Sequence, residues 1–354
     1  MKTSRRVFVA GMLASLAACR SEGAKTAQID QGLCLRDVAE SAGLQFGSAY
    51  DTVAITDPAY GDLLVRHAGI LVTDYSLKFK PLRRNSPDAD FTTADRIVAF
   101  ARNNGIPVRG HNLIWNEGNP AWLVRATQAE RVYWLERHIV EVMDHYHGQM
   151  HSWDVVNEPF WPDHRKPGGF RDGPWYEAMG SSYIRKAFEV ATRADPDVRL
   201  VLNEAWVERT DLLGQSVRKG LFELLQDLLA AGVRLSAVGL QCHLRPLVSM
   251  SLPVLSDFLY KLSELPIDVY ISELDIDDGG MSGDVDAQIG AIYGQFVSMI
   301  KSHSNVKILC TWQLADKYSF YRDKYKRPVR TLPFDENLQA KIAVQEIVSA
   351  LQKS

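Results

Sequence analysis

Two stretches of the chain decide the fold, Trp153-Asp154-Val155-Val156-Asn157-Glu158-Pro159 and Val269-Tyr270-Ile271-Ser272-Glu273-Leu274-Asp275. Each is a mainly apolar run of β-forming residues that brings a glutamate to its end. A buried strand offers no solvent to a carboxylate, so each glutamate needs either an ionic partner or a chemical role. The two stretches therefore predict two buried strands whose ends carry functional groups.

Working outward from these stretches, strand-like runs alternate with helix-like runs as far as the C-terminus. Helical periodicity is clearest in 91–104, where Thr92 or Thr93 is the predicted N-cap and Gly105 the stop. The predicted strands are 45–50, 70–73, 107–111, 152–157, 199–203, 237–241, 269–272 and 307–311, and the other predicted helices are 183–194, 212–231, 287–301 and 337–352.

Repeated strand–helix units with short connections and no Pro/Gly/Ser-rich linker predict one parallel α/β domain. Eight repeats of this size match a single (β/α)₈ TIM barrel better than a doubly wound sheet. No glycine-rich phosphate loop is present, so a nucleotide-binding fold lacks its main sign.

In such a barrel the chemistry lies where strands end and βα loops begin. Polar and aromatic residues fall at these positions repeatedly: His111, Trp115, Asn157, Glu158, Asn203, Glu204, Gln241, His243, Glu273, Asp275 and Trp312. Two carboxylates on one rim are the equipment for hydrolysing a glycosidic bond. The alternative is that Glu158 and Glu273 each anchor only an ion pair at a strand end.

The composition of the chain excludes some classes of binding partner. The 354 residues carry 40 Lys and Arg against 43 Asp and Glu, which argues against nucleic acid or an anionic membrane surface as the main partner. The rim offers only His111 and His243 as imidazole ligands, so we expect neither metal nor cofactor. The histidines between residues 138 and 151 are predicted to lie on a solvated helix and loop away from the rim. We expect a monomer.

The N-terminus is predicted to lie outside the fold. Residues 1–19 combine the pair Arg5 and Arg6 with a short apolar run, which is typical of an export signal and resembles a twin-arginine signal. Leu16-Ala17-Ala18-Cys19 resembles a bacterial lipobox, so Cys19 is a candidate for lipidation; ordinary cleavage with loss of Cys19 is the alternative. Residues 20–32 are a short polar linker, and 33–354 form the barrel. The predicted location is the periplasm or the cell envelope of a bacterium, and secretion from the cell is the alternative.

Five motifs in order resemble glycoside hydrolase family 10, from about Leu35 to the C-terminal helix. They are Arg109-Gly110-His111-Asn112-Leu113-Ile114-Trp115, Trp153 to Glu158, Val238-Gly239-Leu240-Gln241-Cys242-His243, Ile271 to Asp275, and Thr311-Trp312-Gln313-Leu314-Ala315-Asp316-Lys317-Tyr318-Ser319-Phe320. That family consists mainly of endo-β-1,4-xylanases on a (β/α)₈ barrel. The resemblance implies a retaining hydrolase of a xylan-type polysaccharide.

The resemblance also implies roles by position. Glu158 resembles the general acid/base and Glu273 the nucleophile. Asn157 resembles the asparagine that binds the sugar 2-hydroxyl, while His243 and Asp275 hold the nucleophile. Gln241, Trp312, Lys78, His111 and Trp115 resemble further contacts of the reacting sugar and its neighbours.

Several outer positions depart from the family pattern. Asp74 and Tyr75 replace a Glu-Asn pair, Asn116 replaces a second histidine, Phe320 replaces a second tryptophan, and Trp206 ends a segment that is usually Asn-Asp-Tyr-Asn. These departures leave open a β-glycanase with altered subsites, acting on another β-linked glycan such as a bacterial exopolysaccharide. The sequence is also compatible with a barrel that only binds glycan and with a metal-dependent barrel hydrolase.

Overall fold

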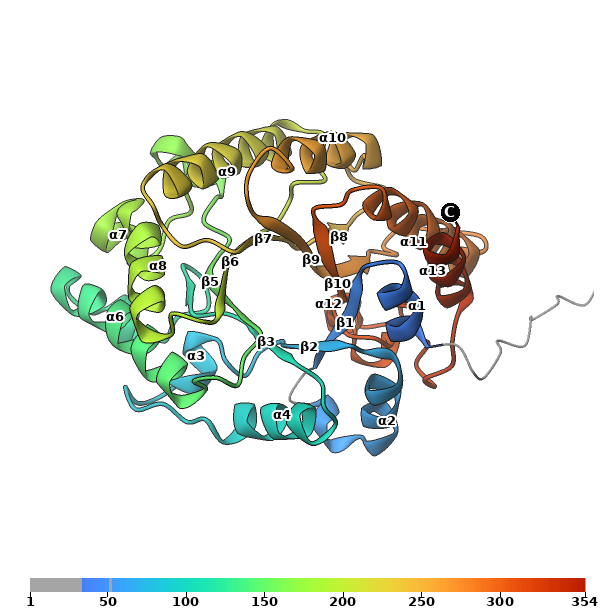
Figure 1. Ribbon diagram of the computed structural model, residues 1–354, viewed down its shortest axis with the longest axis horizontal. Coiled ribbons are helices and arrows are strands. Elements are labelled where there is room, and N and C mark those ends of the chain that lie inside the picture. The colour runs from blue at the N-terminus through green and yellow to red at the C-terminus, as the bar shows by residue number, and fades with distance from the viewer. Residues whose placement is uncertain (1–33, 51–52, 354) are drawn as a thin grey trace, which may run out of the picture. The chain divides into compact units, whose positions relative to one another are not determined.

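The computed structural model describes residues 34–50 and 53–353, which contain a closed barrel of eight parallel strands (Figure 1). The strand order is β10-β1-β2-β3-β5-β6-β7-β9, and the pairing of β10 with both β1 and β9 closes the ring. The predicted (β/α)₈ barrel is confirmed. The barrel strands are β1 (Gln45–Tyr50), β2 (Ile70–Thr73), β3 (Val108–Gly110), β5 (Ser152–Asn157), β6 (Arg199–Glu204), β7 (Ala237–Leu240), β9 (Asp268–Ile276) and β10 (Val306–Thr311).

Two short strands extend the barrel wall at its carboxyl end. β4 (Ile114–Trp115) pairs with β5, and β8 (His243–Leu244) pairs with β9. Neither was predicted, because two residues give no periodicity to detect. They fix the backbone of Trp115 and His243 beside the strands that carry the two glutamates.

The helices surround the barrel (Figure 1). They are α1 (Leu35–Ser41), α2 (Pro58–His67), α3 (Phe79–Leu82), α4 (Thr92–Asn103), α5 (Ala121–Val124), α6 (Gln128–His145), α7 (Pro174–Met179), α8 (Ser182–Ala194), α9 (Leu212–Ala230), α10 (Leu252–Leu262), α11 (Val285–Lys301), α12 (Phe320–Tyr325) and α13 (Ile342–Gln352). Within residues 34–50 and 53–353, no helix has the length and apolar character needed to cross a membrane.

The start of α4 differs from the prediction in its cap. The N-cap of α4 is Phe91 rather than Thr92 or Thr93, and it forms no side-chain cap; instead, the Thr92 amide donates to the Asp90 carboxylate at 3.0 Å. The α4 C-terminus is as predicted, with Gly105 just beyond it at φ 66°.

The last helix, predicted from residue 337, begins only at Ile342. The Asp335 carboxylate accepts hydrogen bonds from the amides of Asn337 and Gln339, and Leu338 between them has φ 63°. This turn satisfies the backbone locally and delays the helix, which is a use to which short acidic side chains are well suited.

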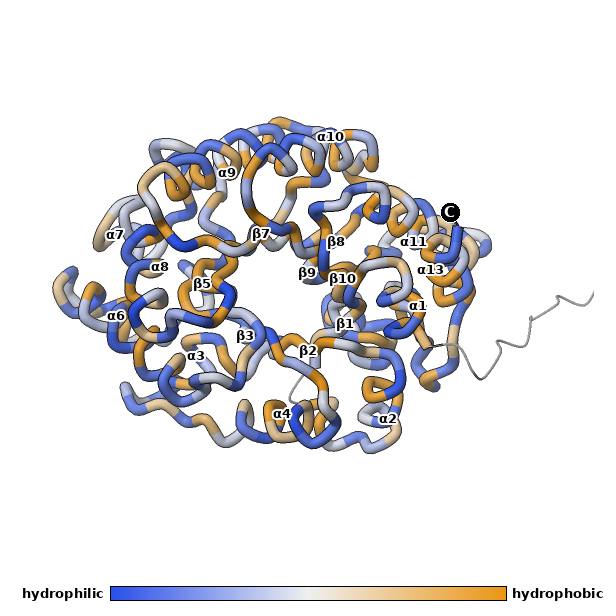
Figure 2. Tube along the Cα trace, viewed as in Figure 1, coloured by the Kyte–Doolittle hydropathy of each residue, from blue (hydrophilic) through white to orange (hydrophobic). Residues whose placement is uncertain are grey.

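Apolar side chains form one large core between strands and helices and a smaller one inside the barrel. The inner core is Ala49, Ile70, Val72, Val201, Ala237, Tyr270, Ile308, Cys310 and Trp312. Along the trace, apolar segments concentrate on the strands and polar ones on the outer loops (Figure 2). Because the barrel interior is filled, polar side chains at the strand ends gather at one rim.

Cys34, Cys242 and Cys310 are buried free thiols. Cys242 and Cys310 are fully buried and act as small apolar residues of the core.

Close packing in the large core between strands and helices leaves no room for a side chain at Gly110. A Cβ atom there would lie 2.2 Å from Cε3 of Trp153 on the neighbouring strand β5. We expect Gly110→Ala to lower the free energy of unfolding by about 1–3 kcal/mol through overpacking, measured by urea unfolding. Gly61→Ala in α2 is the control, since its Cβ would meet only the Phe100 ring at 3.3 Å. Equal stability of the two variants would contradict this account.

Candidate active site

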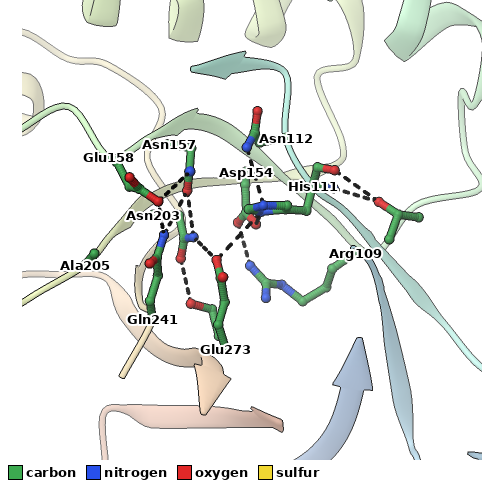
Figure 3. Close-up of polar contacts among 12 residues, drawn as sticks. Arg109, His111, Asn112, Asp154, Asn157, Glu158, Asn203, Ala205, Gln241 and Glu273 are labelled. Carbon is green, nitrogen blue, oxygen red and sulfur yellow. Dashed lines mark hydrogen bonds and ion pairs between the residues drawn. The ribbon is translucent and has the colours of Figure 1, made fainter. Parts of the chain in front are cut away.

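Glu158 lies at the carboxyl end of β5, where the chain leaves the barrel. Its φ of 47° is left-handed, a conformation that is uncommon for a residue with a side chain and is often found at functional sites. Its Oε1 accepts hydrogen bonds from Gln241 Nε2 at 2.8 Å and from Asn157 Nδ2 at 3.2 Å. The predicted neighbours Asn157 and Gln241 therefore lie against the glutamate (Figure 3).

Arg171, which the sequence pattern did not reveal, holds the other side of Glu158. Its Nη2 donates to Glu158 Oε2 at 2.8 Å, its Nε donates to the Glu158 carbonyl at 2.8 Å, and its Nη1 bonds Glu117. Arg171 is 2 % exposed. It comes from the irregular segment before α7, where no periodicity or motif distinguishes it.

Glu273, within β9, is 4 % exposed and has different surroundings. Its Oε1 accepts from Asn203 Nδ2 at 2.7 Å, and its Oε2 lies 3.2 Å from His243 Nε2. His243 Nδ1 lies 2.9 Å from Asp275 Oδ1, so the imidazole bridges two carboxylates.

The charges around Glu273 keep it ionised. Burial alone would raise the pKa of Glu273, but His111, the hydrogen bond and charge of His243, and the Lys78 ammonium together lower it to about 2. Burial opposes the charged form of His243, but the Asp275 and Glu273 carboxylates raise its pKa well above the ordinary value. The site therefore holds a carboxylate beside an imidazolium.

A chain of side-chain amides joins the two glutamates. Asn203 Nδ2 donates to Asn157 Oδ1 at 2.8 Å as well as to Glu273 (Figure 3). The Ser272 hydroxyl donates to Asn203 Oδ1 at 2.6 Å, which fixes the orientation of that amide. The sequence places Asn203 on the rim but assigns it no role.

A buried ion pair lies beneath the site. Arg109 Nη2 is 2.5 Å from Asp154 Oδ1, and Asp154 Oδ2 is 2.9 Å from His111 Nδ1 (Figure 3). The same ring nitrogen lies 3.9 Å from Glu273 Oε1. Arg109 and Asp154 stand within predicted motifs, yet only the fold shows that they orient His111.

Aromatic rings and one lysine lie beside Glu273. Lys78 Nζ is 5.3 Å from the Trp115 ring centroid and 5.7 Å from that of Trp312. His111 meets Trp312 edge-on at 5.3 Å between ring centroids. The structure thus brings together four of the residues predicted to contact sugar.

Asn116 and Asp74, two of the residues that differ from the family pattern, form hydrogen bonds with other residues of the protein. Asn116 is buried, and its Oδ1 accepts hydrogen bonds from the Trp175 and Tyr176 amides at the start of α7. Asp74 accepts from Gln313 Nε2 at 2.8 Å. Both side chains hold loops of the rim in place.

The other residues that differ from the family pattern are Phe320, Tyr75 and Trp206. Phe320 is 43 % exposed, with its ring 6.2 Å from that of His243, and Tyr75 is 38 % exposed. Trp206 carries the guanidinium groups of Arg245 and Arg209 over its ring.

The histidines between residues 138 and 151 form no metal site. Across the described ranges 34–50 and 53–353, no group of histidine, cysteine and acidic side chains could hold a metal ion. The prediction that these histidines are all solvated is wrong for His138, which is fully buried and accepts a hydrogen bond from Arg83 Nε at 3.2 Å.

The sequence is similar to one family of known proteins. The sequence model of glycosyl hydrolase family 10 matches residues 34–350. Endo-1,4-beta-xylanase C of Phanerodontia chrysosporium is 32 % identical over 323 residues, covering 89 % of this chain and 78 % of the relative. Beta-1,4-xylanase of Dictyoglomus thermophilum is 31 % identical, covering 82 % of this chain and 84 % of the relative.

The fold of the chain is similar to those of solved xylanase structures. Native xylanase 10B from Thermotoga maritima superposes with a TM-score of 0.82 at 27 % identity, covering 90 % of this chain and 98 % of that one. Xylanase 10B from Thermotoga petrophila RKU-1, solved in complex with xylobiose, also has a TM-score of 0.82 at 27 % identity, covering 91 % of this chain and 98 % of that one.

The low pKa of Glu273 has a consequence for stability. A carboxyl whose folded pKa is below its unfolded value stabilises the fold at pH values above the unfolded pKa, and the contribution is lost as the pH falls. We expect this loss between about pH 4.5 and about pH 2. Urea unfolding of the wild type and Glu273→Gln across this range should show the wild type losing more stability. Parallel curves for the two proteins would contradict the assignment.

Proposed function

The chain belongs to glycosyl hydrolase family 10, and we propose that it hydrolyses internal β-1,4 linkages of a xylan-type polysaccharide with retention of configuration. Relatives that match most of the chain are named as xylanases. The observation that carries the proposal is the pair Glu158 and Glu273, joined through amides yet surrounded by different charges.

The proposed reaction is a double displacement. Glu273 attacks the anomeric carbon while the bond to the leaving oxygen breaks, and Glu158 gives that oxygen its proton. Glu158, now a carboxylate, removes a proton from water, which attacks the same carbon and releases Glu273. The low pKa of Glu273 supports its role as nucleophile, because the attacking group must be ionised.

The amides and the imidazole are proposed to hold these two groups. Asn157 also binds the 2-hydroxyl of the reacting sugar, a contact that strengthens in the transition state. Gln241 positions Glu158, with its Nε2 2.8 Å from the carboxylate. His243 and Asp275 position Glu273 through the hydrogen bonds that they share.

The outer side chains are proposed to bind neighbouring sugars. Lys78, His111, Trp115 and Trp312 form the wall on the non-reducing side, and Tyr75 and Phe320 extend it toward solvent. Asp74 and Asn116 support the rim through their hydrogen bonds with other residues of the protein, and Trp206 does so through its contact with Arg245. All of these groups belong to one chain, so a monomer is the proposed working unit.

The two roles can be separated with small anions. Glu158→Gln should lower kcat on xylan by roughly 10²–10⁴-fold, the usual contribution of a general acid. On an aryl glycoside with a good leaving group, azide should rescue Glu158→Ala to a β-glycosyl azide and Glu273→Ala to an α-glycosyl azide. The anomers are assigned by NMR. The same anomer from both variants, or wild-type activity in either one, would exclude the proposed roles.

We also propose that residues 1–19 direct export and that Cys19 anchors the protein to a bacterial membrane. Both lie outside the described residues. Support comes from the sequence alone, in the Arg5–Arg6 pair, the short apolar run and the cysteine where that run stops. The proposed location is the periplasm or the cell envelope.

Labelled palmitate tests the anchor. We expect the wild type to take up the label when expressed in a bacterium with lipoprotein-processing enzymes, and Cys19→Ala to take up none. The control is Cys34→Ala, which removes a buried thiol and keeps Cys19. Equal labelling of wild type and Cys19→Ala, or no labelling of either, would exclude lipidation at Cys19.

A further inference from the structure

A guanidinium group lies on an aromatic ring at the rim, beside the catalytic residues. Arg245 follows β8, two residues beyond His243, which contacts Glu273. Its guanidinium carbon lies 4.7 Å from the ring centroid of Trp206. Trp206 itself has φ 67° and meets Trp161 edge-on at 5.9 Å. The ring therefore holds a cation in a fixed place.

The order of the strands places this cation relative to the bond that is cleaved. Glu158 directly follows β5 and Glu273 lies on β9, and these two strands divide the barrel into two arcs. The arc of β10, β1, β2 and β3 leads into Trp312, Lys78 and His111, the proposed non-reducing side. Trp206 follows β6, and Arg245 follows β7 after the short strand β8. Arg245 therefore faces the leaving-group side.

Other charged groups near Arg245 already have partners. Arg209, 5.5 Å from the same ring, pairs with Asp211. The acids that follow β9 are also engaged: Asp277 by Tyr325 and Lys324, and Asp278 by Arg327.

Arg245, in contrast, pairs with no carboxylate in the part of the chain that the structure describes, and its Nε is buried without a hydrogen-bond partner. Glu208, in the segment after β6, is a carboxyl group that feels the Arg245 charge, which opposes the effect of burial on its pKa. It is 2 % exposed, and burial raises its pKa to about 7. Glu208 is therefore largely protonated in mildly acidic solution and does not cancel the charge of Arg245.

A guanidinium stacked on a ring keeps its in-plane N–H groups for other partners. Those groups match the two oxygens of a carboxylate and can bind it with two hydrogen bonds. Neutral xylose offers no such group, whereas a uronic acid does. We propose that Arg245, held on Trp206, binds the carboxylate of a uronic acid that decorates the polysaccharide on the leaving-group side. The inference rests on the proposed function and names a substrate class for it.

The test compares two forms of one polymer. The first is a β-1,4-xylan with uronic acid side groups; the second is the same xylan after its carboxyl groups have been reduced to alcohols. We expect the wild type to have a kcat/KM about tenfold higher on the acidic form, the size expected of one charge-assisted pair. In Arg245→Gln the ratio of the two values should fall to about one.

Two further variants isolate the cause. Arg245→Lys keeps the charge but not the planar fork, so its ratio should lie between those of the wild type and Arg245→Gln. Arg185→Gln removes an exposed guanidinium from α8, where it pairs with Glu189, and should keep the wild-type ratio. Unbranched xylo-oligosaccharides serve as a common substrate that reports on folded enzyme.

The outcomes separate this inference from the proposed function. A wild-type ratio near one, or an unchanged ratio in Arg245→Gln, overturns the role of Arg245 while xylan cleavage stands. If the wild type cleaves neither polymer nor the xylo-oligosaccharides, the proposed function itself fails. If Arg185→Gln loses the preference as strongly as Arg245→Gln, the effect is one of overall charge and the role of Arg245 is again overturned.

Discussion

The rim is organised around one requirement, that the Glu273 carboxylate stay ionised while it is almost fully buried. An ion in such a place is costly unless charges and hydrogen bonds compensate it. Here the compensation comes from Asn203 on β6, His243 on β8, His111 directly after β3, and the charge of Lys78. These groups come from segments that are far apart in the sequence, and only the packing of the barrel brings them together. The ionised state of Glu273 therefore depends on the fold.

The surroundings of Glu158 differ from those of Glu273. It stands in a left-handed turn beyond β5, where one oxygen meets the amides of Gln241 and Asn157 and the other meets Arg171. Two carboxyls in unequal surroundings are what a double displacement needs, since one must give a proton while the other attacks. The amides of Asn157 and Asn203 connect the two carboxyls and fix their relative positions.

Much of the barrel could be predicted because buried strands are long apolar runs with chemistry at their ends. What escaped prediction depends on contacts that no local pattern records. The two-residue strand β8 exists only because β9 is beside it, and the last helix starts late because Asp335 binds two amides before it. Arg171 reaches Glu158 from an irregular loop 13 residues further along the chain, and Asn203 acquires its role only from the neighbouring Ser272 and Glu273.

The pairing of β1 with β10 brings Gln45 next to Ile308, so the barrel closes between the two ends of the domain. During synthesis, the arc from β5 to β9 can be assembled while the last strand is still within the ribosome. The arc that carries Lys78 and Trp312 can be completed only after β10 has left the ribosome, since contacts between distant segments form only when both exist. The half of the rim built earliest in sequence is therefore the half whose packing is completed last.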